Sequence, residues 1–90
     1  MKNYNEWPPV KYLIRVLKNC PNSALLYIQL WKNQNKHYKI SVRKKEIRKL
    51  YLISPTMFRN SISPLAFLSL VSFAEDEEQF QIEIFGHVDE

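Results

Sequence analysis

Apolar residues from Ile47 to Val71 are spaced as in two consecutive helices that lead into a strand. Ser54-Pro55 marks the start of the second helix, because Ser accepts hydrogen bonds from free backbone N–H groups and Pro fits the first helical position. The apolar side of this helix is formed by Met57, Phe58, Ile62, Leu65 and Leu68. Pro64 removes a backbone hydrogen bond inside it and crowds the preceding turn. We therefore expect a kink or a break near residues 60–63.

The preceding helix is predicted over residues 43–51, with Ile47 and Leu50 facing inward and basic side chains outward. Further upstream, Ser23 is the predicted N-cap of a helix that runs to about Gln34. A short half-buried strand follows, in which Tyr38, Ile40 and Val42 alternate with polar residues.

Another short helix is predicted after Pro8-Pro9. Four apolar residues in it are spaced i, i+3, i+4 and i+7 and are expected to face the core: Val10, Leu13, Ile14 and Leu17. At the other end of the chain, residues 70–73 and 80–85 read as strands, joined by the polar stretch 74–79 as a hairpin. The expected fold class is α+β, mainly α, with a small antiparallel sheet and a C-terminal β-hairpin.

The length of 90 residues allows one domain with one core. We expect an N-terminal arm and short helix over 1–22, the domain proper over 23–85, and a frayed tail over 86–90. A core of this size gives limited stability, which favours a homodimer. Cys20 is the only cysteine and no apolar run suits a signal peptide or a membrane helix, so a soluble cytoplasmic protein without membrane contact is expected.

The formal net charge of +4 hides a strong asymmetry along the chain. Residues 1–73 hold all 13 basic residues and two of the 9 acidic ones, whereas residues 74–90 hold the other seven acids and no Lys or Arg. Many of the basic residues are concentrated between Lys32 and Lys49, which suits the binding of a polyanion. The alternative is an ordinary solvated helix face.

The predicted order of helix, helix, strand, helix, helix, strand, strand resembles the winged helix superfamily, particularly MarR-like and DnaD-like regulators and replication initiators. The apolar spacing from Glu46-Ile47 through Ile53-Ser54 to Leu70-Val71 carries the resemblance, together with the helix start at Ser23-Ala24. It covers residues 23–85. Three positions depart from the pattern, since Arg48 replaces a small residue, and Leu52 and Ser69 replace glycines. A reshaped or strained turn is expected at Leu52.

The resemblance implies that the protein binds double-stranded DNA, with the helix that begins at Pro55 in the major groove. Base contacts would come from Thr56, Arg59, Asn60 and Ser63, with Arg59 suited to guanine and Asn60 to adenine. Phosphate contacts would come from Lys39, Arg43, Lys44, Lys45, Arg48 and Lys49, making binding strongly salt-dependent. The expected role is regulation of transcription or replication. A plain solvent-facing helix is the alternative for Arg59 and Asn60.

The tip of the predicted hairpin is acidic and would be repelled by DNA. Its residues are Glu75, Asp76, Glu77 and Glu78. They would bind a basic protein partner or keep the protein soluble. The alternative function is therefore a protein–protein interaction module that uses the acidic hairpin and the first helix.

Enzyme function is not expected. His37 and His87 lack metal-ligand spacing, Cys20 lacks a nearby base, and Gly86 alone cannot form a phosphate loop. We predict no catalytic residue, metal or cofactor. Aromatic residues set among basic ones would suit single-stranded nucleic acid, but most have core-facing spacing, so duplex binding is preferred.

Overall fold

The computed structural model describes residues 7–85. It contains the helices α1 (Val10–Asn19), α2 (Ala24–Asn33), α3 (Lys44–Tyr51) and α4 (Pro55–Phe67), with a short 3₁₀ helix η1 (Pro21–Ser23), and the strands β1 (Lys39–Arg43), β2 (Val71–Glu75) and β3 (Gln79–Ile84). The α+β class is confirmed. Residues 1–6 of the expected N-terminal arm and the expected tail over 86–90 lie outside the described residues. Within the described chain no helix combines the length and apolar character that crossing a bilayer requires.

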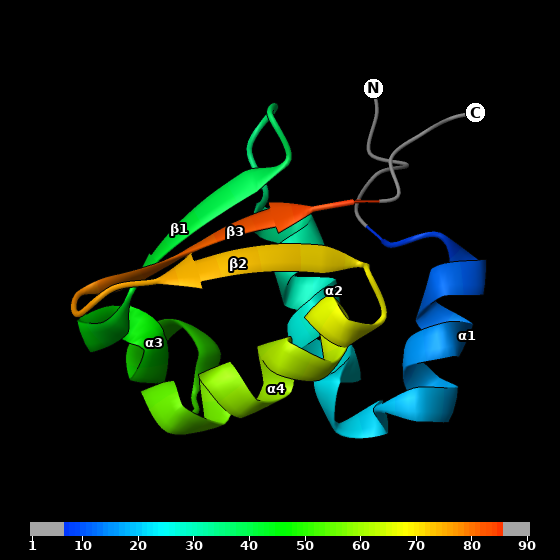
Figure 1. Ribbon diagram of the computed structural model, residues 1–90, viewed down its shortest axis with the longest axis horizontal. Helices are drawn as coiled ribbons and strands as arrows, with labels where there is room; N and C mark the ends of the chain where they lie inside the picture. The colour runs from blue at the N-terminus through cyan, green and yellow to red at the C-terminus, as the bar shows by residue number, and fades with distance from the viewer. Residues whose placement is uncertain (1–6, 86–90) are drawn as a thin grey trace.

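The strands form one antiparallel sheet with the order β1-β3-β2, so the last strand lies in the centre. The sheet covers one side of the molecule, α2 and α4 lie beneath it, and α3 lies under the end where β2 turns into β3 (Figure 1). α1 stands at the opposite end from this turn. The predicted C-terminal hairpin is thus present, and its turn lies close to α3.

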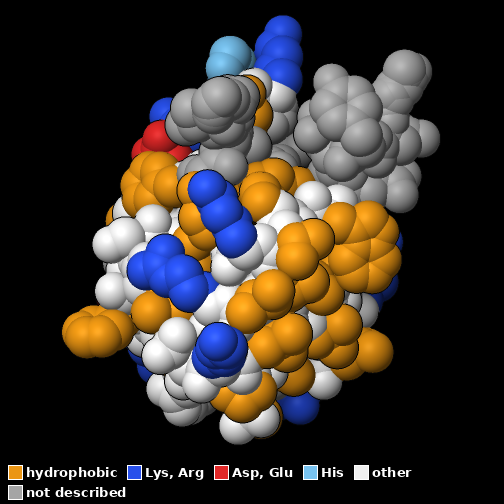
Figure 2. Space-filling view, turned by 90° about the vertical axis from the view of Figure 1, so that its right-hand side faces the viewer, with side chains coloured by type: hydrophobic (Ala, Val, Ile, Leu, Met, Phe, Trp, Pro, Cys, Tyr) orange, Lys and Arg blue, Asp and Glu red, His pale blue; other side chains and the backbone are white. Residues whose placement is uncertain are grey.

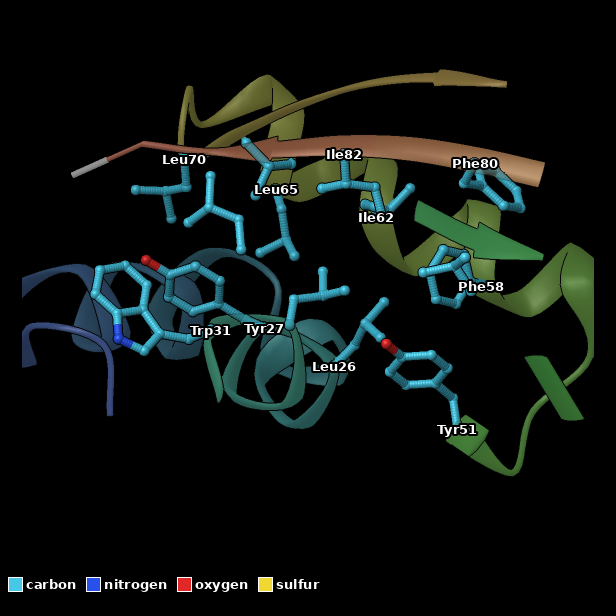
Figure 3. Packing of buried hydrophobic residues seen from close by; sticks show 14 of the residues in the cluster. Leu26, Tyr27, Trp31, Tyr51, Phe58, Ile62, Leu65, Leu70, Phe80 and Ile82 are labelled. Atoms are coloured by element: carbon cyan, nitrogen blue, oxygen red, sulfur yellow. The ribbon is translucent and has the colours of Figure 1, made fainter. Parts of the chain in front are cut away.

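The core lies between the inner face of the sheet and the helices. Phe80, Ile82 and Ile84 alternate inward along β3, as their spacing predicts. Figure 3 shows Phe80 and Ile82 on the side of β3 that faces the labelled side chains of α4 and α2. The ring centroids of Phe58 and Phe80 lie 4.9 Å apart, which joins α4 directly to the central strand.

The first helix forms as predicted, but of its four residues predicted to face inward only Leu13 packs against the core. Val10 is 70% exposed, Ile14 and Leu17 are also exposed, and Val16 is the buried residue instead. The guanidinium of Arg15 donates to the carbonyl oxygen of Leu68 at 3.0 Å, which turns that side of α1 toward the connection between α4 and β2. Figure 2 shows the result, with hydrophobic side chains gathered on the α1 side of the molecule and Lys and Arg side chains beside them.

Two details of the second helix differ from the prediction. Ser23 belongs to η1 with helical backbone angles, and its side chain makes no capping hydrogen bond. An N-cap residue needs an extended backbone to aim its side chain at the helix end, so Ser23 is badly placed for that role. Its hydroxyl is buried and donates to the carbonyl oxygen of Ser61 instead.

Of the predicted kink or break near residues 60–63, the break is wrong, because α4 is continuous through Pro64. Phe58, Ile62 and Leu65 are all fully buried, which holds the helix to the core on both sides of the proline. Pro64 has no N–H to donate to the carbonyl of Asn60, which belongs to an exposed residue. The helix begins as predicted, since the N–H of Met57 donates to the hydroxyl of Ser54 at 3.1 Å.

Two apolar residues predicted to face inward are exposed. Leu50 and Met57 both point to solvent, and Tyr51 is the buried residue at the end of α3. Each predicted residue lies at the edge of its helix's apolar arc. Packing against the neighbouring helix selected the other edge.

Leu52 and Ser69 both have a left-handed backbone, each with φ of 64°. Leu52 ends α3, and its N–H donates to the carbonyl oxygen of Arg48 at 3.0 Å. Left-handed residues with a Cβ are strained by about 1–2 kcal/mol. The turn therefore keeps a conformation that favours glycine, and the strain expected at Leu52 is present.

Candidate nucleic-acid interface

The outward face of α4 is a polar stripe. Thr56, Asn60 and Ser63 are all exposed, as predicted from the burial of the opposite face. The hydroxyl of Ser63 donates to the carbonyl oxygen of Arg59 at 2.9 Å, so its lone pairs remain available to an external donor. The stripe offers neutral hydrogen-bonding groups over the first two turns of the helix.

Phe67 continues this stripe and was missed in the sequence analysis. It is 89% exposed and lies seven residues after Asn60, which places both on one side of the helix. The same spacing rule that selected Thr56, Asn60 and Ser63 would have found it. A large apolar side chain at the end of a polar stripe adds a contact surface there.

Arg59 lies at the edge of the stripe and forms an ion pair with Glu75 of β2. Its Nε donates to Oε1 at 2.8 Å and its Nη2 donates to Oε2 at 2.6 Å. This bidentate contact raises the pKa of the Arg59 guanidinium, chiefly through the hydrogen bonds to Glu75. Arg59 was predicted to point outward and to contact guanine. The structure leaves its side chain 43% exposed but pairs its charge.

Lys44 contacts the same carboxylate. Its Nζ lies 2.6 Å from Oε2 of Glu75, and the Glu75 side chain is 21% exposed. Hydrogen bonds from Arg59 first, and from Lys44 second, lower the pKa of Glu75 to about 2. Glu75 therefore joins the first residue of α3, the second turn of α4 and the end of β2. It is ionised at neutral pH.

The remaining basic residues of α3 and the last residue of β1 make no ion pair among residues 7–85. They are exposed: Arg43, Lys45, Arg48 and Lys49. We call these four residues the α3 basic surface. Lys39, which was predicted to share the phosphate contacts, lies at the other end of β1 opposite Glu83. Three residues of strand lie between it and Arg43, which sets them about 13 Å apart along the strand.

Two of the four acidic side chains at the hairpin tip, Glu75 and Asp76, make contacts within the molecule. Besides the pairing of Glu75, Oδ1 of Asp76 accepts hydrogen bonds from the N–H groups of Glu78 and Gln79, both at 2.8 Å. These bonds lower the pKa of Asp76. The N–H of Lys44 donates to the carbonyl oxygen of Glu78 at 2.8 Å, so the tip lies against the start of α3. Glu77 and the carboxylate of Glu78 are what remain for an external partner.

Side chains that could bind a metal ion or act as a nucleophile are not gathered into one site among residues 7–85. Between residues 7 and 85 no three His, Cys, Asp or Glu side chains are grouped so as to hold a metal ion. Burial raises the pKa of the Cys20 thiol, which makes it a poorer nucleophile at neutral pH. His37 is exposed, and His87 lies outside the described residues.

Comparison of the chain with protein-family models, curated proteins and solved structures found no match. The proposed function is therefore based on the polar stripe of α4, the α3 basic surface and the contacts of Glu75.

Proposed function

We propose that this protein binds double-stranded DNA as a winged helix protein, with α4 in the major groove and the β2–β3 hairpin as the wing. The order of elements from α2 to β3 supports the proposal, because it is the order that the resemblance implies. The left-handed backbone at Leu52 and Ser69 supports it too, since the superfamily pattern has glycine at both positions. Such a protein would regulate transcription or replication.

The observation that carries the proposal is the outward polar stripe of α4, on the helix that follows the basic helix α3. A helix enters the major groove side-on, so its outward side chains meet base edges while neighbouring elements meet the phosphates. Asn60 has the paired donor and acceptor that match adenine, and Thr56 and Ser63 can bond to several bases. Arg59 supplies donors for guanine.

Phosphate binding would rest on Arg43, Lys45, Arg48 and Lys49, which are exposed on the α3 side. Lys44 is engaged by Glu75, and Lys39 lies too far along β1 to join them. The carboxylates of Glu77 and Glu78 would be repelled by DNA, so the wing tip stays outside the contact. The DNA-binding surface is therefore smaller and less positive than the charge of the first 73 residues suggests.

A salt titration with a short duplex of random sequence tests this proposal. Four phosphate contacts predict a slope of about −3.6 in log affinity against log salt, so affinity falls about a hundredfold between about 50 and about 200 mM. The double variant Lys45→Gln/Lys49→Gln should lower the slope by about 2. The matched control Lys11→Gln/Lys18→Gln removes the same charge from α1, at the other end of the molecule, and should leave the slope unchanged.

Absence of binding at low salt rules out the proposal. Equal changes of slope in the two double variants would show that binding follows net charge and has no defined surface.

The exposed face of α1 favours a second candidate function, a protein-contact module. Val10, Ile14 and Leu17 form an apolar stripe, and Lys11 and Lys18 are exposed beside it. This chemistry fits a partner helix with apolar side chains flanked by carboxylates. An antiparallel two-fold pairing of α1 with a second copy would set like charges together, which is unfavourable.

An acidic amphipathic peptide with leucines at helical spacing tests this candidate, with a lysine version of the same peptide as the control. Binding of the acidic peptide alone, lost in Ile14→Ser, supports it. The expected homodimer stays a prediction, and a dimeric molar mass in solution that Ile14→Ser abolishes would assign this face to self-association instead.

A further inference from the structure

We propose that Glu75 is a positioning residue that holds Arg59 in the orientation needed to contact guanine. The inference rests on the proposed DNA binding and concerns how one base is selected. It assigns a role to an acidic residue that the charge pattern alone would place in a DNA-repelling hairpin.

The geometry of the ion pair leaves free the edge of the guanidinium that can contact guanine. Glu75 occupies the Nε and Nη2 edge, with distances of 2.8 and 2.6 Å. A guanidinium has five N–H donors, so both hydrogens of Nη1 and one of Nη2 remain. One hydrogen of each Nη points away from the ion pair, and these two form the fork that pairs with O6 and N7 of guanine. The 43% exposure of the Arg59 side chain means that this group is still accessible.

The carboxylate itself is held in place. Glu75 is the last residue of β2 and pairs in register with Phe80, which is fully buried in the central strand. Lys44 Nζ contacts Oε2 at 2.6 Å from the first turn of α3. Arg59 is thus fixed relative to α3 and the sheet as well as to its own helix. A long side chain that is ordered before binding loses less conformational entropy when it binds.

Glu75 would have two opposite effects on DNA binding. Its negative charge lies near the phosphates and lowers affinity for any duplex. Its contacts with Arg59 raise the preference for guanine at one position. Because the first effect depends on charge and the second on contact, a matched pair of variants separates them.

The variants are Glu75→Gln and Glu77→Gln, which remove the same charge from the same hairpin. Glu77 is exposed and no contact of its carboxylate with Arg59 is found in residues 7–85. Each variant is used to select duplexes from a random library, alongside the wild type and Arg59→Gln, and its affinity for unselected duplex is measured. Thermal unfolding of each variant confirms that it is folded.

We expect the wild type to select guanine at one position and Arg59→Gln to lose that preference. Glu75→Gln should bind random duplex more tightly and lose about tenfold in preference for guanine at that position alone. Glu77→Gln should gain affinity for random duplex and keep the preference.

Retention of the full preference by Glu75→Gln overturns the inference and leaves the proposed function intact. An equal loss of preference in Glu77→Gln overturns it as well, since charge would then be the cause. A wild-type chain that binds no duplex refutes the proposed function, and this inference with it.

Discussion

The hydroxyl of Ser23 lies 2.7 Å from the carbonyl oxygen of Ser61, 38 residues along the chain, and donates a hydrogen bond to it. This bond joins η1 to the middle of α4, close to Pro64. Ser23 is buried, so removal of its hydroxyl leaves the carbonyl oxygen of Ser61 without this donor. We expect Ser23→Ala to lower the free energy of unfolding by about 1 kcal/mol. Denaturant unfolding measures it, with the exposed Ser41→Ala as a control that should change little.

The hydroxyl of Tyr27 is buried and has no hydrogen-bond partner among residues 7–85, and burial raises its pKa. Tyr27→Phe removes an unsatisfied polar group and should raise the free energy of unfolding by about 1 kcal/mol. Tyr51 is the contrasting case, because burial raises its pKa while the side chain of Asn33 opposes this rise. Tyr51→Phe should lower stability by a similar amount. Opposite signs for these two variants are the expected result, and equal signs would contradict it.

The left-handed backbone at Leu52 predicts that glycine stabilises this turn. The side chain is 82% exposed, so Leu52→Gly loses little packing. Relief of strain outweighs the greater freedom of the unfolded chain, giving a gain of about 0.5–1 kcal/mol. Leu52→Val, which stiffens the side chain at the same backbone position, should be destabilising. A thermal unfolding midpoint that falls in Leu52→Gly would show that Leu52 makes a contact worth more than the strain.

The lowered pKa of Glu75 predicts how the contribution of its ion pairs varies with pH. The pKa is about 2 in the folded protein and 4.5 ordinarily, so folding favours the ionised form. The contribution is therefore fully present above about pH 4.5 and is lost as the pH falls toward 2. We expect the difference in unfolding free energy between the wild type and Glu75→Gln to be constant near neutrality and to shrink over this interval. A difference that is unchanged at pH 3 would contradict the ion-pair geometry.

Local patterns in the sequence predicted most elements because each pattern has a local cause. Ser54-Pro55 started α4 as expected, since the cap and the proline act within one turn. The alternation of Phe80, Ile82 and Ile84 predicted a half-buried strand, and β3 has that pattern. Leu52 was predicted to lie in a reshaped or strained turn, because the turn needs a left-handed backbone even where the residue is not glycine. The backbone at Leu52 is left-handed. The helices, the strands and the position of the polar stripe on α4 followed from such rules.

The rotation of α1, the continuity of α4 and the partner of Arg59 depended on the tertiary structure. Spacing shows that a helix has an apolar side, but contacts with α2 and with the carbonyl of Leu68 decided which part of α1 was buried. Burial on both sides of Pro64 kept α4 continuous through a residue that breaks isolated helices.

Arg59 and Glu75 are 16 residues apart on different elements, and no periodicity links them. By itself the sequence determined which segments are helical or extended and which residues carry charge. Only packing determined which charges meet, because an ion pair between distant residues requires the sheet and α4 to be held at a fixed separation.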